Sequence, residues 1–260
     1  MNVHAHSTAL DLRDSRDILG SSVASLEWNE GILLLRRLLS EGRFTKVSFL
    51  NANNANIAFR DADFAAALDD FLVLPDGIGV DIAAKLLYGR AFPANLNGTD
   101  FVPALLCAET EPLTVALLGA KRGNAEAAAK RLSSLAPQHS FVFIHDGFFS
   151  AGEEARILRQ IEALRPDILL VAMGVPRQEL WIAKNISRRH CTMPIAVGAL
   201  LDFLSGSVPR APLWMRTLRI EWVFRLMLEP RRLWRRYVVG NPLFLLRVVG
   251  QKLSQRGRLP

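Results

Sequence analysis

The stretch DILLVAMGVPRQEL, residues 167–180, decides the fold class. Its first seven residues form a short and nearly continuous apolar run, which is typical of a strand that is buried on both faces. A glycine and a proline follow, and residues 176–189 then place apolar and charged side chains at helical spacing. A strand that passes through a glycine turn into a helix is the repeating unit of a parallel α/β sheet.

The same unit recurs on both sides of this stretch. Short apolar runs predict five further strands, at residues 47–50, 71–75, 113–118, 141–144 and 194–197. Segments of helical period lie between them, for example at 121–134 and 152–164. We therefore expect an α/β protein with a Rossmann-like, mostly parallel sheet and helices on both faces.

The charges divide the chain of 260 residues into unequal parts. The net charge is +7, yet residues 205–260 hold eleven Arg and one Lys against two Glu, so the remainder carries −3.

Residues 1–26 show no periodicity and are expected to form a flexible arm. We assign residues 27–206 to the α/β core. Residues 207–260, in which Arg, Trp and Leu alternate without strand signals, are expected to form a basic helical appendage, with helices over 213–228 and from Pro230 and Pro242.

Composition excludes several classes of protein. Half of the residues are apolar and 22% are charged, which excludes intrinsic disorder. The two cysteines form no Cys-x-x-Cys pair, so neither a disulfide framework nor a zinc site is indicated. No run approaches the roughly 18 apolar residues that a membrane-spanning helix needs, and the N-terminus does not resemble a signal peptide. We therefore expect a cytoplasmic protein.

Functional residues are expected at the carboxyl ends of the strands, where open parallel sheets bind their ligands. Glycines follow almost every predicted strand, and the N–H groups of the helix N-termini beside them would suit a phosphate. The sequence has no P-loop motif, and Gly77-Ile78-Gly79 lacks the third glycine of a dinucleotide-binding loop. The strand ends therefore favour an anionic ligand, although the sequence has no standard motif for binding its phosphate.

Asp76 is the most informative carboxylate, because it directly follows a predicted strand. A carboxylate fixed there could act as a general base on a hydroxyl, or it could accept backbone hydrogen bonds in a turn or helix cap. Asp61 and Asp63 spell an Asp-x-Asp, but they fall in a segment of helical period at 57–68. Two carboxylates alone are a poor cage for a metal ion, and we predict no metal site.

Two further features leave alternatives open. Gln178 and Glu179 follow the strand at 167–173, where they could stabilise the start of a helix or bind a nucleobase or sugar hydroxyls. The Arg-, Trp- and Leu-rich appendage could bind nucleic acid, dock on a membrane surface or form a solvated helical face. Its leucine-rich stretches favour the membrane, with some arginines left for a diphosphate. The apolar stretches could also serve a contact between copies of the chain.

Colinear motifs across residues 45–236 resemble those of the WecG/TagA/CpsF glycosyltransferases, glycosyltransferase family 26. The matching stretches, with x for positions outside the match, are LNA (50–52), PDGxG (75–79), NGTD (97–100), LGA (118–120), DGFF (146–149), GVPRQExWI (174–182), GAxxD (198–202), RAP (210–212) and EWxxRLxxEPxR (221–232). Their common order makes the set far more specific than any one motif.

The resemblance implies an inverting bacterial enzyme that transfers a hexose or an N-acetylhexosamine. The donor would be a UDP-sugar and the acceptor a polyprenyl-diphosphate-linked saccharide, in the synthesis of a cell-surface polysaccharide or exopolysaccharide. The resemblance further implies that no metal or other cofactor takes part. Such an enzyme would act as a peripheral protein on the cytoplasmic face of the plasma membrane, and no nucleic acid partner is expected.

The resemblance also implies roles for single residues. Asp76 would be the general base, and cations of the appendage would stabilise the leaving diphosphate; the candidates are Arg210, Arg216, Arg219, Arg225 and Arg232. Asn51 and Asn97 would line the sugar pocket, and Gly119, Gly174, Gln178 and Asp202 would bound the UDP site. The remaining candidates for substrate binding are Asn54, Gly77, Asp100, Asp146, Pro176 and Glu179.

One position departs from the family pattern. Some relatives have a threonine two residues before the asparagine that matches Asn51, and this chain has Phe49 there. Either the sugar pocket differs, or Asn53 or Asn54 replaces the hydroxyl. The run of asparagines and the similarity to exopolysaccharide-building members make glucose a candidate donor sugar.

Two other functions are compatible with parts of the sequence. A nicotinamide-dependent dehydrogenase would use the same doubly wound sheet. A membrane- or RNA-binding adaptor would use the appendage alone, but it would leave Asp76 and the glycine-lined strand ends without a role.

Overall fold

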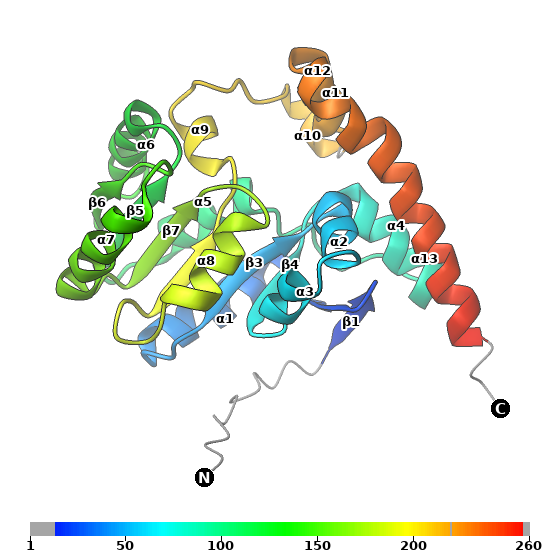
Figure 1. Ribbon diagram of the computed structural model, residues 1–260, viewed down its shortest axis with the longest axis horizontal. Helices are drawn as coiled ribbons and strands as arrows, with labels where there is room; N and C mark the ends of the chain where they lie inside the picture. The colour runs from blue at the N-terminus through cyan, green and yellow to red at the C-terminus, as the bar shows by residue number, and fades with distance from the viewer. Residues whose placement is uncertain (1–13, 219, 257–260) are drawn as a thin grey trace, which may run out of the picture.

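The computed structural model describes residues 14–218 and 220–256 and is built around a six-stranded sheet (Figure 1). The strand order is β4-β3-β8-β7-β5-β6, and every neighbouring pair is parallel. The strands are β3 (Lys46–Leu50), β4 (Phe71–Pro75), β5 (Thr114–Gly119), β6 (Ser140–His145), β7 (Ile168–Ala172) and β8 (Met193–Ala196). The predicted fold class is confirmed, and each of these strands lies within one residue of its predicted bounds.

Helices cover both faces of the sheet, so its strands are apolar on both sides (Figure 1). Leu72 and Leu74 point into one core, against α1 (Trp28–Ser40), α5 (Gly98–Ala108), α6 (Arg122–Leu135) and α9 (Leu200–Leu204). Phe71 and Val73 point into the other core. That core is formed with α2 (Ala52–Ala58), α3 (Ala62–Leu68), α4 (Ile78–Tyr88), α7 (Ala151–Leu164) and α8 (Arg177–Asn185).

Part of the predicted flexible arm is folded, and its residues 1–13 lie outside the described residues. Residues 15–24 form a hairpin, β1 (Ser15–Ile18) and β2 (Ser21–Ala24), which packs beside β4 and α4. Leu19 and Gly20 make its two-residue turn with positive φ angles of 53° and 89°. Each strand has only four residues and little alternation, so the sequence pattern did not reveal a hairpin that Ile18 and Val23 anchor in the core.

Two predicted helical segments are interrupted. The segment at 57–68 divides between α2 and α3, because the Asp61 side chain accepts a hydrogen bond of 3.0 Å from the Phe64 N–H and begins a new helix. The segment at 213–228 divides into α10 (Leu213–Thr217) and α11 (Glu221–Leu228). Helical spacing alone does not show such breaks, since both pieces continue nearly the same periodicity.

The end of the chain forms one long helix. It begins at Pro230 as predicted, with α12 (Pro230–Trp234), widens to a π turn at Arg235–Val239 and continues as α13 (Gly240–Arg256). A separate helix starting at Pro242 was therefore wrong. The π turn ends three residues before Pro242, whose missing N–H removes one hydrogen bond from the regular ladder. Figure 1 shows this helix running from α12 down one side of the molecule.

The long helix is packed into the core and is more than an appendage. Phe244 and Val248 on α13 are fully buried in the same apolar cluster as β4 and α4. Gly79 on α4 permits the close packing of α4 on α2, because a Cβ there would lie 3.0 Å from the Ala52 Cβ. Arg247 also donates hydrogen bonds of 2.7 and 3.1 Å to Asn56 on α2. The C-terminal helix therefore helps to hold α2 and α4 in place.

We predict that Phe244→Ala lowers the free energy of unfolding by about 3–5 kcal/mol, because it removes a fully buried ring from a core. Leu246→Ala is the matched control. Leu246 is two residues away and 69% exposed, so its loss should change the free energy by less than about 0.5 kcal/mol. Urea unfolding curves give both values, and equal effects of the two substitutions would contradict the packing of α13.

Candidate active site

Asp76 lies at the carboxyl end of β4, in a turn held by backbone hydrogen bonds. Its own N–H donates to the Leu50 carbonyl at 2.9 Å, which ties the end of β4 to the end of β3. Gly77 follows with a φ of +89°, a backbone conformation that favours glycine, and its N–H donates to Asn95 Oδ1 at 2.7 Å. The direction of the Asp76 side chain is therefore fixed from both sides.

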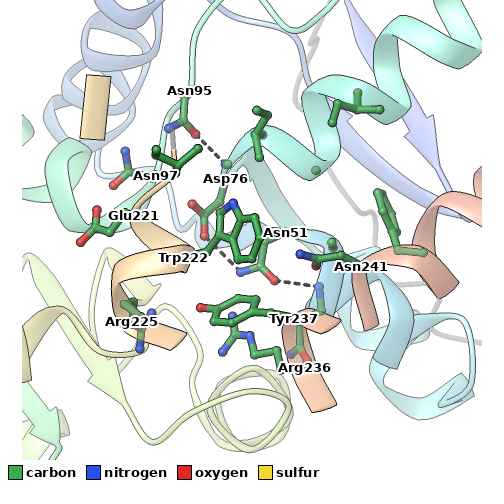
Figure 2. A pocket seen from close by; sticks show the side chains of 18 of the residues that line it. Asn51, Asp76, Asn95, Asn97, Glu221, Trp222, Arg225, Arg236, Tyr237 and Asn241 are labelled. Carbon is green, nitrogen blue, oxygen red and sulfur yellow. Dashed lines mark hydrogen bonds between the residues drawn. The ribbon is translucent and has the colours of Figure 1, made fainter. Parts of the chain in front are cut away.

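Asn51, at the end of β3, orients the Asp76 carboxylate. Its Oδ1 accepts hydrogen bonds of 3.1 Å from the N–H groups of Asn53 and Asn54 and so caps α2. The amide Nδ2 must then point the other way, and it donates to Asp76 Oδ2 at 3.1 Å (Figure 2). One asparagine therefore starts a helix and holds the candidate base.

The surroundings of Asp76 change its acidity. Burial raises the pKa of this carboxyl above its ordinary value, because a low dielectric disfavours the charged form. The hydrogen bond from Asn51 and the positive charges of Arg236 and Arg225 act in the opposite direction, and Glu221 adds to the rise. The result is a carboxyl that is more basic than an exposed aspartate and still has cations nearby to support its ionised form.

Asp76 faces a cavity of about 670 Å³ that the core and the C-terminal segment enclose together. The core supplies a wall rich in amides and carboxyls, with Asn51, Asn53, Asp76, Gly77, Asn95, Asn97, Thr99 and Asp100. The C-terminal segment supplies the opposite wall, with Arg216, Glu221, Trp222, Arg225, Arg236, Tyr237, Asn241 and Leu245. Figure 2 shows Trp222, Tyr237 and Arg236 gathered around the Asn51 and Asp76 pair. Neither wall alone would form this site.

Three arginines line the cavity, on α10, α11 and the π turn. The Nε atoms of Arg216, Arg225 and Arg236 are buried and have no hydrogen-bond partner among the residues that the structure describes. Arg216 also lies 3.6 Å from a carboxylate oxygen of Asp100. A buried guanidinium Nε without a partner is costly, so Arg225 and Arg236 are the best-placed groups in the cavity to receive an anion.

The predicted arginines divide into separate groups. Arg216 and Arg225 line the cavity as expected, whereas Arg219 lies outside the described residues. Arg232 does not lie in the cavity as its predicted role requires. Its side chain is 63% exposed and pairs with Glu229. Sequence reasoning missed Arg236, which follows Arg232 by one helical turn.

Arg210 also has a different role from the predicted one. It does not line the Asp76 cavity, and its guanidinium is paired with Asp100 and Glu221. A cation already shared by two carboxylates is poorly suited to receive a diphosphate.

Among the predicted substrate-binding residues, Asn51, Gly77, Asn97 and Asp100 line the cavity. Asn54 does not, because its amide donates to the Phe49 carbonyl at 2.8 Å in a buried position. Phe49 itself packs on Gly98 of α5, where a Cβ would come within 2.8 Å of its ring. The aromatic side chain at this departure from the family pattern therefore points away from the cavity, and Asn53 is the neighbouring amide that reaches it.

The predicted UDP-site residues lie at the carboxyl ends of β5 to β8, outside the Asp76 cavity. Gly119 is required by packing, since a Cβ there would meet the Ala172 carbonyl oxygen at 2.3 Å. The Asp146 side chain accepts the Phe148 N–H at 2.9 Å in a turn, and Asp202 accepts the Asn124 amide at 2.7 Å. Gly174 is exposed and Pro176 half-buried at the end of β7.

Gln178 and Glu179 make hydrogen bonds within the protein, below these strand ends. Gln178 Oε1 accepts the N–H groups of Gly174 at 3.2 Å and Gly198 at 3.1 Å, so it joins the turns after β7 and β8. Its amide donates to Glu179, which also accepts the Ser48 hydroxyl. Both side chains are buried, and their direct contact with a nucleobase or sugar stays a prediction.

No group of three or more His, Cys, Asp or Glu side chains that could hold a metal ion occurs in residues 14–218 and 220–256. Asp61 caps α3, and Asp63 lies in the first turn of that helix. The Asp61 carboxylate therefore serves the start of α3.

Comparisons with known proteins point in one direction. The model of the glycosyl transferase WecG/TagA/CpsF family matches residues 16–258. The chain is 31% identical over 216 residues to the N-acetylglucosaminyldiphosphoundecaprenol N-acetyl-beta-D-mannosaminyltransferase of Bacillus subtilis (strain 168), and the match covers 82% of each chain. It is 30% identical over 181 residues to a protein of the same name from Staphylococcus aureus (strain NCTC 8325 / PS 47), with 69% of each chain covered.

We predict that Asp76→Asn stabilises the fold at neutral pH. The folded-state pKa of Asp76 is raised, so between the ordinary pKa of about 4 and the folded value the native state retains a proton that the unfolded chain has lost. The free energy of unfolding of the wild type therefore falls as the pH rises through this window. The variant has no carboxyl at this position, so its free energy of unfolding does not fall for this reason. The difference in the free energy of unfolding, measured by urea titration, should grow from pH 4 to pH 8; a difference independent of pH would contradict the burial of this carboxyl.

Proposed function

Because the chain belongs to the WecG/TagA/CpsF family and is a glycosyltransferase, we propose that it moves a hexose or an N-acetylhexosamine from a UDP-sugar to a polyprenyl-diphosphate-linked saccharide. The product would be an intermediate in the synthesis of a bacterial cell-surface polysaccharide. The observation that carries this proposal is the half-buried Asp76 carboxylate, held by Asn51 in a cavity that arginines of the C-terminal segment close.

Asp76 would act as the general base in a single displacement. Its carboxylate takes the proton of an acceptor hydroxyl, and the oxygen attacks the anomeric carbon of the donor sugar. The bond from that carbon to the UDP oxygen breaks as the new glycosidic bond forms, so the configuration inverts and UDP leaves. The raised pKa suits this role, because a more basic carboxylate is a better proton acceptor near neutral pH.

Arg225 and Arg236 would meet the charge that develops on the leaving diphosphate. Both line the cavity, and the Nε atoms of both lack partners among the described residues. A guanidinium keeps its charge and binds phosphate oxygens in a bidentate manner, which stabilises a phosphate leaving group without a metal ion. We propose that the reaction is metal-independent for this reason.

The donor would extend from the cavity toward the centre of the sheet. The chain leaves β5 toward β6 and β7 toward β8, so the direction of winding reverses between the neighbouring strands β5 and β7. Ligands of doubly wound sheets bind at such a reversal, and exposed Gly174 lies beside it. We therefore place the uridine near the ends of β5 and β7 and the sugar among the asparagines of the cavity.

A donor screen tests this function. The relatives are named for N-acetylmannosaminyl transfer to N-acetylglucosaminyldiphosphoundecaprenol, so UDP-N-acetylmannosamine with that acceptor is one arm, and UDP-glucose, which the sequence motifs suggested, is another. Each is incubated with a synthetic lipid-diphosphate acceptor, with and without a chelator. Transfer from one UDP-sugar that survives the chelator supports the proposal, and absence of transfer from every UDP-sugar contradicts it.

We predict that Asp76→Asn lowers kcat by about 10²–10⁴-fold, the usual contribution of a general base, while UDP still binds. Calorimetry with UDP separates the two effects. Arg225→Gln should lower kcat by about 10²–10³-fold through lost stabilisation of the leaving group. Arg232→Gln is the matched control in the same segment, since Arg232 lies outside the cavity and should leave kcat unchanged. Near-normal turnover of Asp76→Asn would contradict the assignment of Asp76 as the general base.

The C-terminal segment would also place the enzyme at the cytoplasmic membrane surface, where a polyprenyl-linked acceptor resides. No helix in the described part of the chain is long and apolar enough to span a bilayer. Large apolar side chains are nevertheless exposed along α10 to α13, namely Leu213, Trp214, Leu218, Met227, Leu228, Trp234, Val238, Val239, Leu246, Val249 and Leu253. Exposed arginines, including Arg231 and Arg235, lie among them. Apolar and cationic groups together favour peripheral docking on anionic lipid.

We predict that the protein sediments with vesicles that contain phosphatidylglycerol and much less with pure phosphatidylcholine. Replacing Trp214 and Leu218 together by serine should weaken binding by about tenfold or more, because two exposed apolar groups no longer enter the interface. Leu33→Ser is the control, since Leu33 is 61% exposed on α1, far from the C-terminal segment in sequence. If both sets of substitutions weaken binding equally, or if the exposed groups mediate self-association in solution, membrane docking through this segment is wrong.

A further inference from the structure

We propose that Arg210 is a positioning residue that holds α10 and α11 over Asp76, and that it does not itself bind the diphosphate. Its effect on catalysis rests on the proposed function, whereas its effect on the placement of the two helices does not.

Arg210 joins three parts of the chain through one guanidinium. It belongs to the connection between α9 and α10, and its Nη2 donates to Asp100 Oδ1 on α5 at 2.9 Å. Its Nε donates to Glu221 Oε1 at 3.1 Å, at the first residue of α11. The Arg210 side chain is only 24% exposed. Two carboxylates from the core and the C-terminal segment are thus bridged by one largely covered cation, which is stronger than an exposed pair.

Asp100 provides a firm anchor for this contact. It lies in the first turn of α5, where its N–H is bonded to Asn97 Oδ1 at 3.1 Å and Asn97 Nδ2 donates to its carboxylate at 3.2 Å. The same Asp100 oxygen that accepts from Arg210 lies 3.6 Å from Nη1 of Arg216 on α10. One carboxylate at the edge of the core therefore holds both the connection and α10.

Phe203 extends the contact to the cation that faces the cavity. The guanidinium carbons of Arg210 and Arg225 each lie 5.3 Å from the centre of its ring. Phe203 belongs to α9 and lines the cavity. The ring that supports Arg210 thus also sets the position of Arg225 on α11, and Figure 2 shows Arg225 one turn from Glu221 on that helix. Loss of Arg210 would release Glu221 and the first turn of α11 together.

These contacts separate Arg210 from the other arginines of the segment. Its Nε and Nη2 are already shared between Asp100 and Glu221, whereas Arg225 and Arg236 have buried Nε atoms without partners among the described residues. The geometry therefore assigns anion binding to Arg225 and Arg236 and the closing of the segment to Arg210. A lysine could not replace it fully, because an ammonium is a point charge and lacks the planar fork that reaches both carboxylates.

Hydrogen–deuterium exchange of the full-length protein tests the placement directly. In Arg210→Gln, amides of residues 213–228 should exchange at least about tenfold faster, because the charged hydrogen bonds that close the segment are lost. Exchange in β7 should not change. Arg232→Gln, the matched control, should resemble the wild type throughout, and Arg210→Lys should lie between wild type and Arg210→Gln. Unchanged exchange of 213–228 in Arg210→Gln would overturn the proposal.

Kinetics test the consequence for catalysis. Arg210→Gln should lower kcat by about 100-fold through misplacement of α11, with a change of less than about threefold in KM for the UDP-sugar. Glu221→Gln in the Arg210→Gln background should add little, since both changes break the same ion pair. Fully multiplicative losses would show that Arg210 acts on the substrate itself and would overturn the proposal. Inactivity of the wild type with every UDP-sugar would defeat the proposed function, and the exchange data would still decide the role of Arg210.

Discussion

The hydrogen bond from Asn51 to Asp76 is the contact on which the site depends. It is available only because β3 and β4 are neighbouring parallel strands, so residues that are 25 positions apart end side by side at one edge of the sheet. The amide oxygen of Asn51 caps α2. The NH₂ group of the same amide must therefore point the other way, toward Asp76. A rigid sheet edge thereby holds a half-buried carboxylate in one orientation, and such preorganisation is what a general base requires.

The carboxylate becomes part of a closed site only through the end of the chain. Phe244 and Val248 bury α13 against α2 and α4, which are the helices that follow β3 and β4. The π turn before α13 presents Arg236 and Tyr237 to the cavity, and π turns of this kind are frequent at functional sites. Folding of the C-terminal segment and assembly of the cavity are therefore the same event. The exposed apolar groups of that segment then connect the closed site to the surface on which a lipid-linked acceptor would be found.

The sequence predicted the sheet and part of the site for a clear physical reason. Strands buried on both faces carry continuous apolar runs, and their carboxyl ends converge, so the sequence alone places Asn51, Asp76 and Gly77 at one edge of the sheet. The sequence could not show which of several residues of the same type enters the site. Arg232 and Arg236 look alike in a segment with eleven arginines, and only the packing of the long helix shows which one enters the cavity. Gln178 and Glu179 stand at a strand end like Asp76, yet three-dimensional contacts use them to brace Gly174 and Gly198.

The most direct test of this arrangement is a crystal structure of the full-length protein with UDP and a soluble analogue of the acceptor. The β-phosphate should lie within hydrogen-bond distance of Arg225 and Arg236, with the acceptor hydroxyl beside the carboxylate of Asp76. A complex in which the diphosphate occupies the strand ends while both guanidinium groups remain directed elsewhere, or in which the hydroxyl lies far from that carboxylate, would contradict a catalytic site shared by the sheet edge and the C-terminal segment.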